Sequence, residues 1–160
     1  DERGDGRKGR QMRALRCERA LLRRPDGSAR WAQGRSCVLA CVYGPRSPLH
    51  GAGNSLEAEV EVVWKPLHGM PGPRERRLEH VLQQAVAAAV LRGLHPRTSV
   101  LVVLQEVADD GSLAACALNA ASAALLDAGI AMEGVLAGCQ CAFSGELLVD
   151  PDAEEEAGAG

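Results

Sequence analysis

A chain of 160 residues suits a single domain, because it is long enough to bury a core and too short for two. Hydrophobic residues make up 46% of it but aromatic residues only 2%, so Ala, Val and Leu must build that core. The net charge is −3, yet residues 1–46 hold twelve Lys or Arg against five Asp or Glu. No apolar run is long enough for a membrane span, so we expect a protein of the cytosol or nucleus with no membrane contact.

The N-terminal part changes character at residue 26. Residues 1–25 are rich in Arg with little apolar periodicity, which predicts an extended or partly disordered basic arm. The turn Pro25-Asp26-Gly27 then starts the ordered region. The run SCVLACVYG at 36–44 is β-prone throughout and predicts a buried strand.

The middle of the chain combines strand and helix patterns. Residues 56–64 place a Glu at alternate positions, which predicts a strand with one solvent-exposed face. Apolar residues at helical spacing over 75–94 predict an amphipathic helix. The β-rich run at 99–108 predicts a strand in the middle of a sheet.

A turn at Asp109-Asp110-Gly111 leads into the last elements. Ser112 is a candidate N-cap for an Ala-rich helix that runs to Ala128, with Gly129 at its C′ position. Two strands within 134–150 follow, joined by a hairpin turn at Ser144-Gly145.

This order predicts an α+β domain with helices packed on one side of a mixed sheet. We expect a basic arm at 1–25, the domain at 26–150 and an acidic, Gly-rich tail at 151–160. Because the chain stops soon after a strand, we also expect that the C-terminal part of a longer domain is missing.

Few residues qualify as catalytic groups by their context. No metal-protease, Walker, Rossmann or triad motif is present. Surface or capping roles are typical for the scattered His50, His68, His80 and His95. The six Cys residues lie mostly in apolar runs and are interpreted as small buried side chains: Cys17, Cys37, Cys41, Cys116, Cys139 and Cys141. A four-thiolate site from Cys37, Cys41, Cys139 and Cys141 is a weaker alternative because no CxxC knuckle is present, so we expect no metal.

The Gly111-Ser112 turn is the strongest candidate for chemistry. Backbone N–H groups at a helix start favour an anion such as phosphate, although a plain N-cap explains the same residues. A phosphate site normally recruits a cation as well, and Arg74, Arg76 and Arg77 precede the long predicted helix. The acidic residues of 150–156 are interpreted as a disordered tail, with Mg²⁺ binding as the alternative.

Several segments together resemble the RNase PH family. They are RGDGR at 3–7, DGSARWAQG at 26–34, VLACVYGP at 38–45, LHPRTSVLVVLQEVADDGSL at 94–113, NAASAALLDAGI at 119–130 and VDPDAEEE at 149–156. They cover nearly the whole chain in the right order, and look closest to the RNase PH-like ring subunits of the eukaryotic RNA exosome. The resemblance implies an RNase PH-like domain of the ribosomal protein S5 domain 2-like fold.

The resemblance also implies a role for the turn. In phosphorolytic members a Gly-Gly-Thr-Arg turn binds inorganic phosphate, which attacks the terminal phosphodiester of RNA. Here Asp110-Gly111-Ser112-Leu113 stands in its place, so Ser112 keeps the hydroxyl and Leu113 replaces the phosphate-binding Arg. A second family Arg, at the start of the long helix, corresponds to Arg74.

This sequence also departs from the pair of catalytic carboxylates found in active members. Glu156 falls at the first catalytic carboxylate position, and the second would lie beyond Gly160. Loss of one preorganised transition-state donor typically slows a reaction by about 10²–10³-fold. We therefore expect no catalytic residue but a degenerate site at Gly111, Ser112, Leu113 and Glu156, with slow or absent phosphorolysis.

We interpret the chain as a non-catalytic structural subunit of the exosome core ring. It would support 3′–5′ RNA processing and degradation, including rRNA maturation and mRNA turnover, by channelling RNA. Its expected partners are other RNase PH-like subunits in a hexameric ring and RNA, which Arg74, Arg76, Arg77 and Arg97 would bind through phosphates. We expect it in the nucleus and nucleolus, and also in the cytoplasm.

Two alternatives stay open. One is a phosphate-dependent 3′–5′ exoribonuclease acting as a homo-oligomer, with Ser112, Arg74 and Glu156 as its site. Only that enzyme would need cofactors, namely Mg²⁺ and inorganic phosphate. The other is a truncated product that exposes apolar surface and needs partners to fold.

Overall fold

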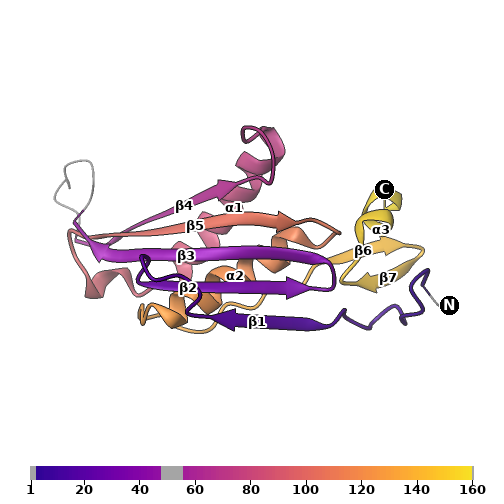
Figure 1. Cartoon of the computed structure of the whole chain (residues 1–160), viewed down its shortest axis with the longest axis horizontal. Coiled ribbons are helices and arrows are strands. Elements are labelled where there is room, and N and C mark those ends of the chain that lie inside the picture. The colour runs from indigo at the N-terminus through magenta and orange to yellow at the C-terminus, as the bar shows by residue number, and fades with distance from the viewer. Residues whose placement is uncertain (1–2, 48–55, 160) are drawn as a thin grey trace.

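The computed structural model describes residues 3–47 and 56–159. Five strands form one sheet in the order β1-β2-β3-β5-β4, and a separate hairpin lies at one end of it (Figure 1). The strands of the sheet are β1 Leu15–Arg19, β2 Gly27–Gln33, β3 Ser36–Arg46, β4 Glu59–Lys65 and β5 Ser99–Ala108. The hairpin strands are β6 Cys141–Ser144 and β7 Glu146–Val149. The helices are α1 Pro73–Ala89, the 3₁₀ turn η1 Arg92–Leu94, α2 Leu113–Asp127 and α3 Ala153–Gly158.

The sheet is mixed, with its two long helices on one face. β3 pairs antiparallel with β5, whereas β4 runs parallel to β5. α2 packs on β2 and β3, and α1 packs on β4; Figure 1 shows both helices behind the sheet. The α+β class with helices on one side, predicted from the sequence, is confirmed.

Alternation along β3 and the composition of α2 place the core between these layers. Val38, Ala40 and Val42 on β3 are fully buried and face α2. α2 buries eleven of its fifteen residues, most of them Ala, so its backbone lies close to the sheet. A Cβ added at Gly27 of β2 would meet Ala128 Cβ at 2.6 Å, so only Gly allows this approach.

The two chain ends are more ordered than the sequence predicts. Leu15–Arg19, expected within an arm, form edge strand β1 and pair antiparallel with β2. Charged residues on an exposed edge strand hide its periodicity and discourage pairing with other chains. Within the acidic tail, Asp152 and Glu155 form a reciprocal capping box that starts α3.

Several element bounds also differ from the prediction. The long helix ends at Ala89 instead of residue 94, because Val90 is extended and bridges Met132. Strand β6 is only the end of the apolar run at 134–143, and β2 was not predicted as a strand. Both segments are rich in Ala and Gly, which give little strand signal.

Some of the cysteines are buried in the core and others are exposed. Cys37 and Cys116 are buried and Cys41 is partly buried, but Cys17, Cys139 and Cys141 are exposed, so the prediction is wrong for these three. Cys17 lies on edge strand β1, and Cys139 and Cys141 lie at the start of the hairpin. Within residues 3–47 and 56–159, no group of three or more His, Cys, Asp or Glu could hold a metal ion.

His68 and His80 are exposed and His95 is partly exposed, whereas His50 lies outside the described residues. None of the helices in the described ranges is long and apolar enough to cross a membrane.

Candidate functional site

The turn between β5 and α2 is shaped by two left-handed residues. Gly111 has φ of 83° and Ser112 has φ of 54°. A Cβ on Gly111 would lie 2.6 Å from Pro151 O and 2.7 Å from Ala153 N, so the segment before α3 passes directly over the turn. The turn is therefore covered by the C-terminal part of the chain.

Successive backbone N–H groups of this turn are all used within the chain. Asp110 N donates to Ser36 Oγ at 2.9 Å, and Gly111 N donates to Asp109 Oδ1 at 3.1 Å. Ser112 N donates to Glu156 Oε1 at 2.6 Å. Each of these three amides already has an acceptor in the chain, so an anion could bind them only by displacing it.

Ser112 occupies the N-cap position without capping the helix through its side chain. Its hydroxyl donates to Pro151 O at 2.9 Å instead. The N-cap position predicted for Ser112 is therefore confirmed, but its side chain makes no capping hydrogen bond.

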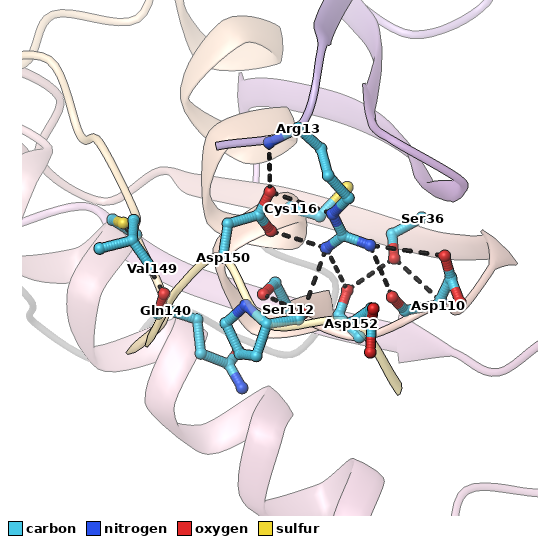
Figure 2. A network of polar contacts seen from close by, with 12 residues as sticks. Arg13, Ser36, Asp110, Ser112, Cys116, Gln140, Val149, Asp150 and Asp152 are labelled. Carbon is cyan, nitrogen blue, oxygen red and sulfur yellow. Dashed lines mark hydrogen bonds and ion pairs between the residues drawn. The ribbon is translucent and has the colours of Figure 1, made fainter. Parts of the chain in front are cut away.

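Arg13, which precedes β1, also binds the turn (Figure 2). Its Nη1 donates to Asp110 O at 2.6 Å, and its Nη2 donates to Gly111 O at 3.0 Å. The same guanidinium makes a fork with Asp150, with Nη2 to Oδ1 at 2.6 Å and Nε to Oδ2 at 3.0 Å. One side chain thus joins the N-terminal segment, the turn and the end of β7.

Asp150 is fully buried and remains ionised in this network. Burial by itself raises the pKa of the carboxyl, but hydrogen bonds from the Arg13 side chain and backbone outweigh it and hold the pKa at about 2. The Arg13 backbone N donates to Oδ2 at 2.8 Å. Asp150 is therefore a structural carboxylate, and a solvated tail does not describe it.

A second pair of ionic contacts lies beside the first. Arg3 Nε donates to Glu155 Oε1 at 2.6 Å, and Arg3 Nη2 also contacts Glu155 Oε2. Hydrogen bonding to Arg3 lowers the pKa of Glu155. Arg7 Nη1 donates to Asp150 O at 3.1 Å. Four of the acidic residues considered for Mg²⁺ are thus engaged by Arg side chains or by amides of the chain itself, namely Asp150, Asp152, Glu155 and Glu156, whereas Glu154 is exposed.

Leu113 follows the turn but does not face its mouth. Its side chain is only 8% exposed and belongs to the apolar core. The position therefore contributes to packing and offers neither charge nor a hydrogen bond to an anion.

The Arg candidates fall into two separate places. Arg74 lies on the first turn of α1 and its Nη2 is 3.8 Å from Asp109 Oδ2, which brings it to the turn. Arg76 and Arg77 are exposed on the same first turn. Arg97 precedes β5, beyond the other end of the seventeen-residue α1, which spans about 25 Å. The four cannot form one patch on this chain.

The sequence interpretation missed the residues that hold the turn together. Arg13 and Ser36 received no role, and Arg3 was noted only within RGDGR. The available signal was an Asp followed by Pro directly after an apolar strand, since a buried carboxylate requires a cationic partner. Which Arg of the N-terminal segment supplies it depends on tertiary structure.

Comparison with known proteins gives the family. Residues 11–131 match the RNase PH model, described as the 3′ exoribonuclease family, domain 1. The chain belongs to this family. The RNase PH-like fold expected from the sequence is thereby confirmed.

Relatives in the 3′ exoribonuclease family match almost the whole chain. The exosome complex exonuclease RRP46 homolog of Oryza sativa subsp. japonica is 43% identical over 158 residues, which are 98% of this chain and 66% of that protein. The homolog of the same name in Arabidopsis thaliana is 45% identical over 157 residues, which are 97% of this chain and 66% of that protein. The chain thus spans 66% of the length of these curated relatives.

Solved structures also superpose on this chain. The crystal structure of rice Rrp46 superposes with a TM-score of 0.94 at 42% identity, covering 98% of this chain and 77% of that one. A structure of the Archaeoglobus fulgidus exosome with RNA bound to the active site gives a TM-score of 0.80 at 22% identity, over 99% of this chain and 74% of that one. At that identity the second likeness concerns the fold alone.

Proposed function

We propose that the chain is a non-catalytic structural subunit of an exosome core ring. The observation that carries this proposal is the state of the α2 turn, whose amides at 110–112 bind acceptors of the same chain. Leu113, at the place of the family's phosphate-binding Arg, is packed in the core. In this state the amides of 110–112 are engaged by the chain itself, and position 113 offers inorganic phosphate no cation.

The kind of assembly is proposed from the relatives. Those with 43% and 45% identity are named for the exosome complex, which supports a ring with other RNase PH-like subunits, hexameric as in the sequence interpretation. In this role the chain would support rRNA maturation and mRNA turnover by lining a path for RNA. It would act in the nucleus, nucleolus and cytoplasm without a metal or cofactor.

One observation favours an enzyme as second candidate. The same relatives carry the word exonuclease in their names, and Arg74 and Glu156 both lie at the turn. Such an enzyme would use Mg²⁺ and inorganic phosphate. Attack of phosphate on the terminal phosphodiester would release one nucleoside diphosphate and leave an RNA one nucleotide shorter.

A single assay distinguishes the two candidate functions. The purified chain is incubated with 3′-labelled RNA, Mg²⁺ and inorganic phosphate, and nucleoside diphosphate is measured. The structural role predicts release no faster than in a sample without protein. Phosphate-dependent release that is abolished by Ser112→Ala would establish the enzyme and overturn the proposal.

A further inference from the structure

Two exposed cysteines lie close together where the chain enters β6. Cys139 precedes the strand, and Cys141 is its first residue. Their thiols are hydrogen bonded to each other, so both sulfur atoms lie on the same side of the extended segment. The pair is a cluster of nucleophilic groups to which the proposed function gives no role.

The backbone on both sides of Cys139 is fixed by hydrogen bonds. Asn119 of α2 binds Gly138 twice, with its Nδ2 donating to Gly138 O at 3.0 Å and its Oδ1 accepting from Gly138 N at 2.8 Å. Gln140 O accepts from Asp150 N at 2.8 Å. Because these contacts fix the chain before and after Cys139, the two thiols stay close without a further loss of backbone freedom. The fold thus preorganises the pair for bond formation.

Small solutes can reach this pair, whereas other cysteines are buried or isolated. Cys139 lines a groove of about 390 Å³ between α1 and α2. Burial raises the pKa of the Cys116 thiol to about 12, so that thiol stays protonated and unreactive at neutral pH. Cys17 is exposed as well, but its partner across the β1–β2 ladder is Trp31. Of these four cysteines, Cys139 and Cys141 combine exposure with a neighbouring thiol.

We propose that Cys139 and Cys141 form a reversible thiol–disulfide site that a hydroperoxide oxidises. Cα atoms two positions apart in an extended chain are about 6.6 Å from each other, near the upper end of the range of about 4.4–6.8 Å that a disulfide spans. A disulfide that is exposed and close to this limit is easily reduced again, as is typical of redox-sensing cysteines. The site goes beyond the proposed function, because it requires neither RNA nor a ring.

The oxidation consumes one molecule of hydrogen peroxide and both thiols. Burial, followed by the effect of Cys141, raises the pKa of Cys139, so Cys139 keeps its proton and Cys141 attacks first as its thiolate. An S–O bond forms at Cys141 as the O–O bond breaks, and the departing hydroxide takes up the proton that Cys141 lost. The Cys139 sulfur then attacks this sulfenic acid, an S–S bond replaces the S–O bond, and the hydroxyl leaves as water with the Cys139 proton. Two thiols are oxidised and the peroxide is reduced to two water molecules.

The test uses the folded, reduced chain, freed of reductant, with hydrogen peroxide as the probe. The treated chain is unfolded in guanidinium chloride, alkylated with iodoacetamide, digested and analysed by mass spectrometry. We expect the peptide that contains Cys139 and Cys141 to lose both alkylation sites and two hydrogen atoms, whereas Cys17 stays alkylated. Reduction with dithiothreitol before alkylation should restore both sites.

Serine variants separate the roles of the two thiols. Cys139→Ser leaves Cys141 without its partner, so the Cys141 sulfenic acid should accumulate and be trapped by dimedone. Cys141→Ser leaves the thiol with the raised pKa and should give less dimedone adduct than Cys139→Ser. Cys17→Ser is the matched control, because it removes an exposed thiol from β1, and it should form the disulfide as the unaltered chain does.

Three results would overturn the thiol–disulfide site. They are full alkylation of Cys139 and Cys141 after peroxide treatment, oxidation of Cys17 to the same extent as the pair, or a disulfide between two chains in place of the internal one. None of them bears on ring assembly or on phosphate-dependent RNA decay. Failure of this site and failure of the proposed function are therefore distinguishable.

Discussion

Arg13 and Asp150 are 137 residues apart in the sequence and form a two-pronged ion pair at 2.6 and 3.0 Å. Asp150 is fully buried, and Arg13 uses its remaining donors on the carbonyl groups of Asp110 and Gly111. The pair links the segment before β1 to the end of β7 and to the turn (Figure 2). The candidate site is thus built on a buried charge pair.

Removal of the cation should destabilise the fold strongly. Arg13→Ala leaves the Asp150 carboxylate buried without its counter-charge, a change that typically costs about 3–5 kcal/mol. The free energy of unfolding is measured by urea titration followed by circular dichroism. Arg16→Ala is the control, because this neighbouring Arg is exposed on β1 and should change stability by less than about 0.5 kcal/mol. Equal effects of both variants would contradict a structural role for the pair.

The pair should also give stability a specific pH dependence. Since Asp150 has a pKa of about 2 in the fold and an Asp in an unfolded chain has roughly 3.9, the ionised carboxylate stabilises the fold above about pH 4. This contribution is lost as the pH falls from about 4 to about 2, and the whole shift corresponds to about 2.6 kcal/mol. Other carboxylates titrate in the variant too, so the informative quantity is the difference between the unaltered chain and Asp150→Asn.

That difference in unfolding free energy should be largest near neutral pH and shrink by about 2 kcal/mol at pH of about 2. A difference that stays constant over this range would show that Asp150 is not ionised in the fold. Urea titrations at several pH values measure it.

The sequence predicted the layers of this molecule better than its connections. The alternation at 56–64 and the helical spacing at 75–94 are local patterns, and both led to the correct element types. Arg13 could not be found in this way, since its partner comes from the far end of the chain. Nothing in the local pattern distinguishes it from Arg10 or Arg16.

Leu113→Arg tests whether the missing cation can simply be restored. Leu113 packs in the core at 8% exposure, so an Arg there must bury a charge or displace the start of α2. We expect a loss of about 2–4 kcal/mol in unfolding free energy and no gain of phosphate-dependent RNA decay. Leu113→Met, similar in volume, should cost less than about 1.5 kcal/mol. A stable, phosphorolytic Leu113→Arg chain would contradict the placement of this side chain.

Leu113 also shows why the site was only partly predictable. The resemblance to the RNase PH family predicts the turn before α2 and an Arg replaced by Leu113. It could not show that the Leu side chain points into the core, because that direction follows from the left-handed Ser112 before it. Nor could it show that Glu156 binds the turn, since this contact needs the folded α3.

RNA binding should depend on one end of α1 more than on the other. Arg74, Arg76 and Arg77 share the first turn of α1, so neutralising all three should weaken RNA binding by the assembled ring at low salt and reduce its salt dependence. Arg97→Ala, beyond the opposite end of the helix, changes one charge and provides the comparison. Filter binding over a series of salt concentrations measures both. Unchanged affinity in the triple variant would remove the α1 residues from the proposed RNA path.

The central claim is that the chain works as a subunit of an exosome ring. Its most direct test is affinity purification of the tagged protein from its own cells, followed by mass spectrometry of the proteins that co-purify. The account predicts recovery of other RNase PH-like subunits together with a separate nuclease. Recovery of the chain alone, as a homo-oligomer that degrades RNA with phosphate, would contradict it.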